Sequence, residues 1–218
     1  LACFPFLILL LTKEWKILRW SIFFSILTVL VSIILFGTNV WIAFLHHFFN
    51  ETSALLTTIW LKTAGIQPTL YTTLRLLGIS GLILKLLISL AGIVISILIV
   101  IIWKKTNRLS LKGSAMILGI FVFMPYFIQY DLMLLSIPFA LLVYDLLEYG
   151  YKKYEIIIVF LLWIMPLINI IIVNLTYVQI SPFITMCVLV LVLHRAKKDY
   201  SNNAIFKSES NNKQHFNV

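Results

Sequence analysis

The residues best suited to chemistry stand together in the stretch PYFIQYDLMLLSIPF, at positions 125–139. Gln129, Tyr130 and Asp131 occupy the point where this stretch becomes a long apolar run. A carboxylate at such a point is costly unless it caps a helix, forms an ion pair or takes part in a reaction. The amide, phenol and carboxylate can orient the hydroxyl groups of a sugar or of an acceptor. We therefore take all three as candidate substrate-binding residues.

A structural role for Asp131 is the first alternative. Pro125 cannot continue the hydrogen-bond ladder of a preceding helix, and the apolar run after Asp131 predicts a new helix. Asp131 then lies at or near the N-cap of that helix, where it accepts hydrogen bonds from free backbone N–H groups and faces the positive helix end. We predict this capping role and treat substrate binding as an addition to it.

Further candidates precede this turn in the chain. His46 and His47 can act as general bases or bind a phosphate, although adjacent histidines on the polar side of a helix are more often merely solvated. Lys62, Tyr71 and Arg75 can bind the phosphate of a lipid-linked substrate, because arginine offers two parallel hydrogen bonds to phosphate oxygens. Contact with lipid headgroups explains these three residues equally well.

Signatures of soluble enzymes and of metal sites do not occur in the sequence. It holds no Gly-rich phosphate loop, no metal-ligand spacing of Cys and His, and no serine elbow. Cys3 and Cys187 lie in apolar segments and are interpreted as small hydrophobic residues. We predict no metal site and no certain cofactor.

The composition identifies the class of protein that positions these residues. Of the 218 residues, 61% are hydrophobic and 11% are charged, and the mean hydropathy is +1.04. These values are typical of a transmembrane protein. The net charge of +9 arises from short clusters of Lys and Arg between apolar runs, so we predict no nucleic-acid partner.

Apolar segments divide the chain. The first, Leu1–Thr12, is too short to span a bilayer and lacks the basic start of a signal peptide, so we expect an N-terminal part of the protein to precede it. We predict about six full spans plus this truncated one in an all-α polytopic membrane protein. The six segments are Ser21–Phe36, Gly81–Trp103, Ser114–Phe127, Asp131–Leu147, Ile156–Val173 and Val178–Leu193.

Basic residues predict the orientation of these spans, because Lys and Arg gather in cytoplasmic loops. Lys85 lies just inside a span at the opposite side, where its side chain can extend outward. Asp145 and Glu148 lie near a cytoplasmic helix end, where we expect lysines to offset them. The clusters predicted to be cytoplasmic are Lys13, Lys16 and Arg19; Lys104, Lys105, Arg108 and Lys112; Lys152 and Lys153; and Arg195, Lys197 and Lys198. The polar tail at 201–218 is predicted to be cytoplasmic and disordered.

The connection Gly37–Ser80 is the one long extracytoplasmic loop in this topology. Its stretch NVWIAFLHHFFNE places aromatic residues on one helical face and both histidines on the other, which predicts a helix lying flat at the membrane surface. A second apolar-rich helix is expected at Ser53–Lys62. A third opens near Pro68 and ends at Gly78. We call 37–80 the platform loop.

The order of these features resembles glycosyltransferase family 87, a family of the GT-C superfamily that contains polyprenyl-phosphate-mannose-dependent mannosyltransferases. The resemblance rests on LACFPFLILLLTKEWKILRW, FGTNVWIAFL, LRLLG and MPYFIQYDLMLL, and it covers nearly all of residues 1–200. It implies a GT-C-like helix bundle in which 1–200 form the C-terminal part of one membrane-embedded glycosyltransferase domain.

The resemblance implies transfer of a hexose from a polyprenyl phosphate to a lipid or glycan acceptor on the extracytoplasmic side. Membrane lipids, the polyprenyl-phosphate-linked sugar and the acceptor are then the partners, and the bacterial inner (plasma) membrane is the expected location. In this family the catalytic acid usually sits in the first outer loop, so the general base is expected upstream of Leu1. Some members carry a His pair where this chain has Gln129–Asp131, a departure that weakens mannose as the donor sugar.

Two other classes of function stay open. A transporter or lipid flippase is expected to show ionisable residues near mid-membrane and related halves, whereas here Asn169, some hydroxyl residues and proline breaks such as Pro166 interrupt the spans. A non-catalytic membrane scaffold needs no platform loop. An Asp or Glu just after a first transmembrane helix, ahead of this sequence, would favour the enzyme.

Overall fold

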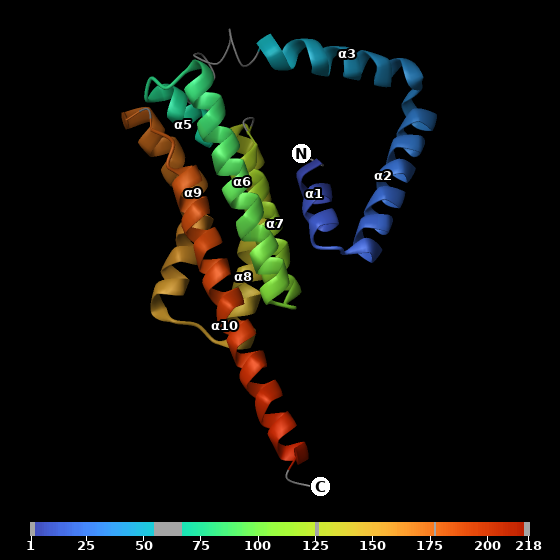
Figure 1. Cartoon of the computed structure of the whole chain (residues 1–218). Helices are drawn as coiled ribbons and strands as arrows, with labels where there is room; N and C mark the ends of the chain where they lie inside the picture. The colour runs from blue at the N-terminus through green and yellow to red at the C-terminus, as the bar shows by residue number, and fades with distance from the viewer. Residues whose placement is uncertain (1–2, 55–66, 125–126, 177, 216–218) are drawn as a thin grey trace. The chain divides into compact units, whose positions relative to one another are not determined.

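The computed structural model describes residues 3–54, 67–124, 127–176 and 178–215, and in these ranges the chain forms helices without a strand (Figure 1). This confirms the predicted all-α class. The chain divides into two compact units, Ala2–Ala64 and Gly65–Val218. Each unit is described by itself.

The described part of the N-terminal unit, residues 3–54, contains three helices. They are α1 (Cys3–Leu11), α2 (Trp15–Phe36) and α3 (Thr38–Ala54). Gly37 separates α2 from α3 with a φ of 80°, a conformation that glycine adopts without a steric cost. The indole Nε1 of Trp41 donates a hydrogen bond of 3.2 Å to Ser32 Oγ, which ties α3 back to α2. A helix therefore begins where the platform loop was predicted to begin, and its orientation in the membrane surface stays a prediction.

The C-terminal unit is a bundle of long helices. Helix α7 packs against α6, α8 and α10, while α9 packs against α8 and α10; Figure 1 shows α6 and α7 side by side. Its buried core includes Ile95, Leu118, Leu142 and Leu189, each with 0% of its surface exposed. The elements are α5 (Leu70–Leu76), α6 (Gly81–Lys105), α7 (Leu109–Phe123), the 3₁₀ helix η3 (Gln129–Leu135), α8 (Ser136–Tyr149), α9 (Lys153–Thr176) and α10 (Ser181–His215).

Four helical segments in the described ranges are long and apolar enough to cross a membrane: Trp15–Phe36, Gly81–Lys105, Gln129–Tyr149 and Lys153–Thr176. The multi-pass prediction is confirmed, but these are fewer full-length spans than the six expected. Helix α7 has 15 residues, which cover about 22 Å of a hydrocarbon core about 30 Å thick. The segment Asp131–Leu147 begins as a 3₁₀ helix, so its span is composite.

Helix α10 differs from the prediction for the C-terminal tail. It continues past residue 200 to His215, where the sequence analysis expected disorder from 201 onward. The physical reason is that neither Gly nor Pro follows Pro182 in the chain, so nothing in the backbone chemistry interrupts the helical hydrogen bonds.

Candidate functional site

Asp131 caps the start of η3 from a position near the N-cap, as predicted. The backbone N–H of Ile128 donates to Asp131 Oδ2 at 2.9 Å, and the Asp131 N–H donates to the Ile128 carbonyl at 2.9 Å. The N-cap is Ile128 and Asp131 is the third residue of the helix, so its carboxylate reaches back to the N-cap N–H as in half of a capping box. The predicted capping role at or near the N-cap is confirmed.

The neighbours of Asp131 fix this turn. Gln129 Nε2 donates a hydrogen bond of 3.2 Å to the carbonyl of Pro166 in α9. Phe127 is buried and stacks on Phe121 with ring centroids 4.2 Å apart. Tyr130 is 65% exposed. Gln129 is therefore committed to positioning the turn, while Tyr130 is presented to the surroundings. Pro125, which the prediction invoked, lies outside the described residues.

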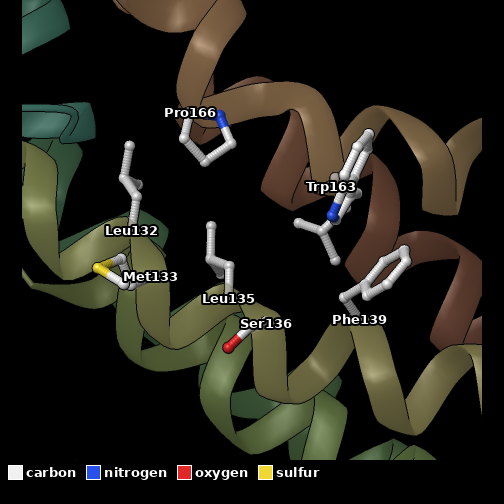
Figure 2. Close-up of a pocket in the computed structure, with 8 residues that line it drawn as sticks. Leu132, Met133, Leu135, Ser136, Phe139, Trp163 and Pro166 are labelled. Atoms are coloured by element: carbon white, nitrogen blue, oxygen red, sulfur yellow. The ribbon is translucent and has the colours of Figure 1, made fainter.

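An apolar pocket of about 230 Å³ lies beside this turn, between the η3–α8 segment and α9 (Figure 2). Its lining residues are Leu132, Met133, Leu135, Ser136, Phe139, Leu162, Trp163 and Pro166. A second pocket of about 310 Å³ shares Phe139 and follows α8 and α9 to Tyr151 and Ile156. We call these two pockets together the α8–α9 groove. Its dimensions and lining suit a hydrocarbon chain.

Helix α5 brings two of the other candidates together. The Arg75 guanidinium donates to Tyr71 Oη at 3.1 Å and lies 5.9 Å from the centre of its ring. The residues are four apart, which places them on one face of the helix. Thr69 caps α5 by accepting a hydrogen bond of 3.1 Å from the Thr72 N–H, so the helix begins two residues after Pro68. Gly78 ends this turn with a φ of 85°.

The remaining candidates lie in other parts of the chain. His46 and His47 are exposed on α3, which belongs to the other unit. Lys62 lies outside the described residues. Lys85 is exposed in the second turn of α6. The assignment of these residues to a substrate site stays a prediction.

A buried polar cluster lies where α5, α9 and α10 meet, and the sequence analysis did not predict it. Asn169 is 0% exposed; its Nδ2 donates to Gln179 Oε1 at 2.8 Å. Its Oδ1 accepts from the N–H groups of Ile180 and Ser181 at 3.1 and 3.3 Å. The only available signal was an asparagine inside the long apolar run of α9.

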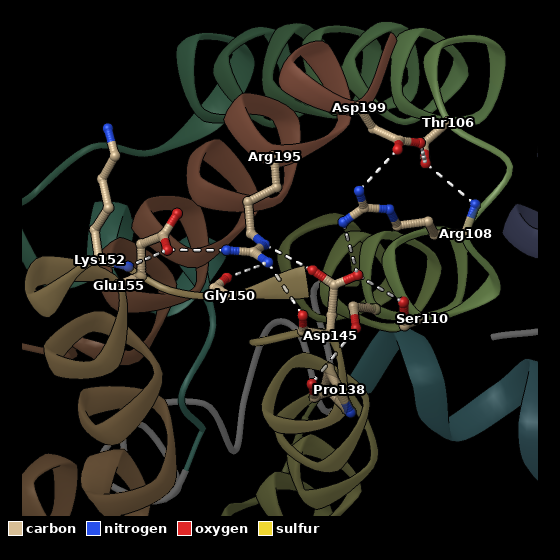
Figure 3. A network of polar contacts seen from close by, with 11 residues as sticks. Thr106, Arg108, Ser110, Pro138, Asp145, Gly150, Lys152, Glu155, Arg195 and Asp199 are labelled. Carbon is tan, nitrogen blue, oxygen red and sulfur yellow. Dashed lines mark hydrogen bonds and ion pairs between the residues drawn. The ribbon is translucent and has the colours of Figure 1, made fainter. Parts of the chain in front are cut away.

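Charged residues form a second buried cluster near the N-terminal end of α7 (Figure 3). This end of the bundle is predicted to be cytoplasmic. Arg195 Nε donates to Asp145 Oδ2 at 2.6 Å, and its Nη1 donates to Glu155 Oε2 at 2.9 Å. Its Nη2 donates to the carbonyls of Asp145 and Gly150 at 3.1 and 3.0 Å. Arg195 thus joins α10 to α8, to α9 and to the turn between them.

Arg108 extends this ion-pair cluster to the connection between α6 and α7. It lies 2.8 Å from Asp199 and 3.5 Å from Asp145, with its guanidinium 3.5 Å from the centre of the Tyr149 ring. Ser110 Oγ donates to Asp145 at 3.0 Å. The expectation that lysines offset Asp145 is wrong: Lys152 contributes its backbone N–H, at 2.8 Å, to Glu155, and the buried carboxylate takes the arginines, whose planar fork makes several hydrogen bonds at once.

The fold and these contacts define a polytopic helical membrane protein with apolar pockets between α8 and α9 and a capped carboxylate turn that directly precedes Leu132, a lining residue of one of them. The model of glycosyltransferase family 87 matches residues 2–136. The chain therefore belongs to glycosyltransferase family 87, a family of membrane glycosyltransferases. No curated protein and no solved structure matches it.

The matched range contains α3, α5 and the Asp131 turn. The resemblance drawn from the sequence is confirmed as to family. The groove's second wall, α9, and the polar partner of α5 at the α9–α10 turn lie after the matched range. In the structure, α5 and the Asp131 turn, which lie in the matched range, are hydrogen-bonded to residues of α9 and α10, which lie after it.

Proposed function

We propose that the protein is a hexosyltransferase that uses a polyprenyl-phosphate sugar as donor and a lipid or glycan as acceptor at the extracytoplasmic face of the bacterial inner membrane. The observation that carries this proposal is the juxtaposition, within the family-matched chain, of a polar turn and an apolar groove. Gln129–Asp131 directly precede Leu132, which lines a mostly apolar pocket of about 230 Å³. A lipid-linked sugar likewise combines a polar head, made of the sugar and the phosphate, with an apolar chain.

The groove supports an isoprenoid donor. Its pockets lie between α8 and α9, which both belong to candidate membrane spans. A polyprenyl chain can stay in contact with the bilayer there while its phosphate remains at the polar end, where desolvating the charge is unnecessary. A soluble nucleotide sugar would gain nothing from this arrangement.

Tyr71 and Arg75 are the residues that we assign to stabilising the leaving polyprenyl phosphate. In the transfer, the acceptor oxygen bonds to the anomeric carbon, the bond from that carbon to the phosphate oxygen breaks, and polyprenyl phosphate leaves with the electron pair. Negative charge grows on the phosphate, and a guanidinium with a phenol beside it stabilises such charge. The acceptor hydroxyl proton passes to a carboxylate base. We do not assign that role to Asp131, since its Oδ2 holds the cap.

Transfer assays test this proposal directly. The purified full-length protein in lipid nanodiscs is incubated with radiolabelled polyprenyl-phosphate mannose or glucose and a membrane lipid extract, with the matching nucleotide sugars in parallel. We expect label to enter the acceptor from a polyprenyl donor and not from a nucleotide sugar. Transfer from the nucleotide sugar alone would overturn the donor assignment.

A further inference from the structure

The buried polar cluster around Asn169 holds α5 in place. Ser181 Oγ donates to the Pro68 carbonyl at 3.1 Å, just before α5 begins. Thr73 Oγ1, on α5 itself, lies 3.4 Å from the Gln179 carbonyl. Asn169 binds the N–H of Ser181 and the side chain of Gln179. One asparagine in α9 therefore fixes the α9–α10 turn, and that turn fixes α5.

Burying the polar side chains of this cluster is energetically unfavourable, which indicates that the geometry of their hydrogen bonds has a role. Asn169, Thr73 and Ser181 are each at most 2% exposed, and polar groups buried in a membrane helix are unfavourable unless they are hydrogen-bonded. An apolar contact would hold α5 against the bundle equally well. Hydrogen bonds add a fixed direction to the contact, because they weaken steeply when misaligned.

The same part of α9 also holds the Asp131 turn. Gln129 donates to the carbonyl of Pro166, three residues before Asn169. Pro166 lacks an N–H and removes one hydrogen bond from the helix at this point. Residues 166–169 of α9 are thus the common support of two elements that carry candidate residues, α5 with Arg75 and η3 with Asp131.

We infer that Asn169 is a positioning residue for phosphate binding: through Gln179 and Ser181 it sets the orientation in which α5 presents Tyr71 and Arg75 to the phosphate of a polyprenyl lipid. This inference rests on the phosphate-binding role proposed above. It adds a residue from outside the family-matched range that touches neither the phosphate nor the sugar. Rigid support of this kind is what sustains a bound geometry.

Two variants weaken the support to different extents. Asn169→Ala removes all three hydrogen bonds of the asparagine, and Ser181→Ala removes only the bond to Pro68, so a folded variant remains if the first fails to fold. Ser96→Ala is the matched control, because Ser96 Oγ donates at 2.8 Å to the Gly92 carbonyl of its own helix. The full chain in nanodiscs serves for all measurements.

Two readouts separate positioning from general stability. Hydrogen exchange of residues 70–76, compared with α6, reports whether α5 loosens. The Kd for unglycosylated polyprenyl phosphate reports the site. We expect Ser181→Ala to speed exchange in α5 alone and to raise the Kd on the order of three- to tenfold, as for loss of a buried hydrogen bond. Ser96→Ala is expected to change neither.

A double variant provides the decisive comparison. If the support acts through Arg75, Ser181→Ala no longer raises the Kd in an Arg75→Ala background. Unchanged exchange in α5, an unchanged Kd, equal effects in both backgrounds, or no binding of polyprenyl phosphate by the wild type would each overturn the inference. Failure of sugar transfer with intact phosphate binding would overturn only the proposed function, since neither readout requires turnover.

Discussion

The two ends of the C-terminal bundle are held together by different chemistry. At the end predicted to be cytoplasmic, Asp145, Glu155 and Asp199 pair with Arg108 and Arg195 in a largely buried cluster. At the opposite end, neutral groups such as Asn169 make the buried contacts. Of the charged residues described there, Arg75 and Asp131 are only partly buried and Lys85 is exposed.

This difference indicates where a charged substrate can bind. Ion pairs that satisfy one another inside a bundle leave little attraction for a ligand, and their role is to lock helices in register. The buried contacts of Asn169 at the other end are neutral hydrogen bonds. A phosphate that binds there, as proposed, meets Arg75, which donates to the phenol of Tyr71.

The largest expected effect concerns which end faces which side of the membrane, because the outcome is all-or-none. In a variant with Cys3 and Cys187 replaced by Ala, single cysteines at Asn50 and Asn107 are treated with a membrane-impermeant thiol reagent in intact cells. We expect Asn50→Cys to be labelled and Asn107→Cys to be labelled only after lysis. The reverse pattern would place the Arg75 end in the cytoplasm and remove the proposed site.

The second effect tests the ion-pair cluster. Arg195→Met leaves Asp145 and Glu155 without their shared partner, and breaking a buried pair in this way costs about 3–5 kcal/mol. We expect loss of monodisperse protein or a strongly lowered Tm in detergent. The control is Arg19→Met, because Arg19 is exposed and bonds only a carbonyl of its own helix. A wild-type Tm for Arg195→Met would show that the cluster does not lock the bundle.

The third effect tests the opposite end. Arg75→Ala removes a charged donor to the phosphate, and a hydrogen bond to a charged group contributes about 1.5–3 kcal/mol, roughly ten- to a hundredfold in affinity. We expect weaker binding of polyprenyl phosphate with a nearly unchanged Tm. Lys104→Ala, a cation change at the exposed C-terminal end of α6, is the control. Equal losses in both variants would point to general charge attraction and not to a site.

The sequence was sufficient for features that depend on neighbours in the chain. Hydropathy predicted the helices, the alternation of basic clusters predicted an orientation, and Pro68 with Gly78 bracketed α5 to within a few residues. The cap of Asp131 was predicted as well, displaced from the N-cap because an acid in the third position reaches back one turn.

Pairings between distant residues were beyond the sequence. Asp145 contacts Arg195, 50 residues further on, in place of the lysines nearby. Asn169 was seen as a polar interruption of a span, but its link to α5 depends on how the α9–α10 turn packs, with Ser181 bonded to a carbonyl 113 residues away. Composition shows that such groups need partners, and only the packing determines which partners they have.

The smallest expected effect concerns Asp131 and decides whether the polar turn is part of the site. Asp131→Asn keeps an oxygen that can accept from the Ile128 N–H and loses the charge; Asp131→Ala loses both. A lost cap commonly costs about 1 kcal/mol, so Ala is expected to lower the Tm modestly and Asn hardly at all. If the cap is the only role, Asn retains wild-type sugar transfer. If Asn abolishes transfer while Tm and expression are unchanged, the charge itself acts on the substrate, and this end of the bundle contributes a carboxylate as well as an arginine.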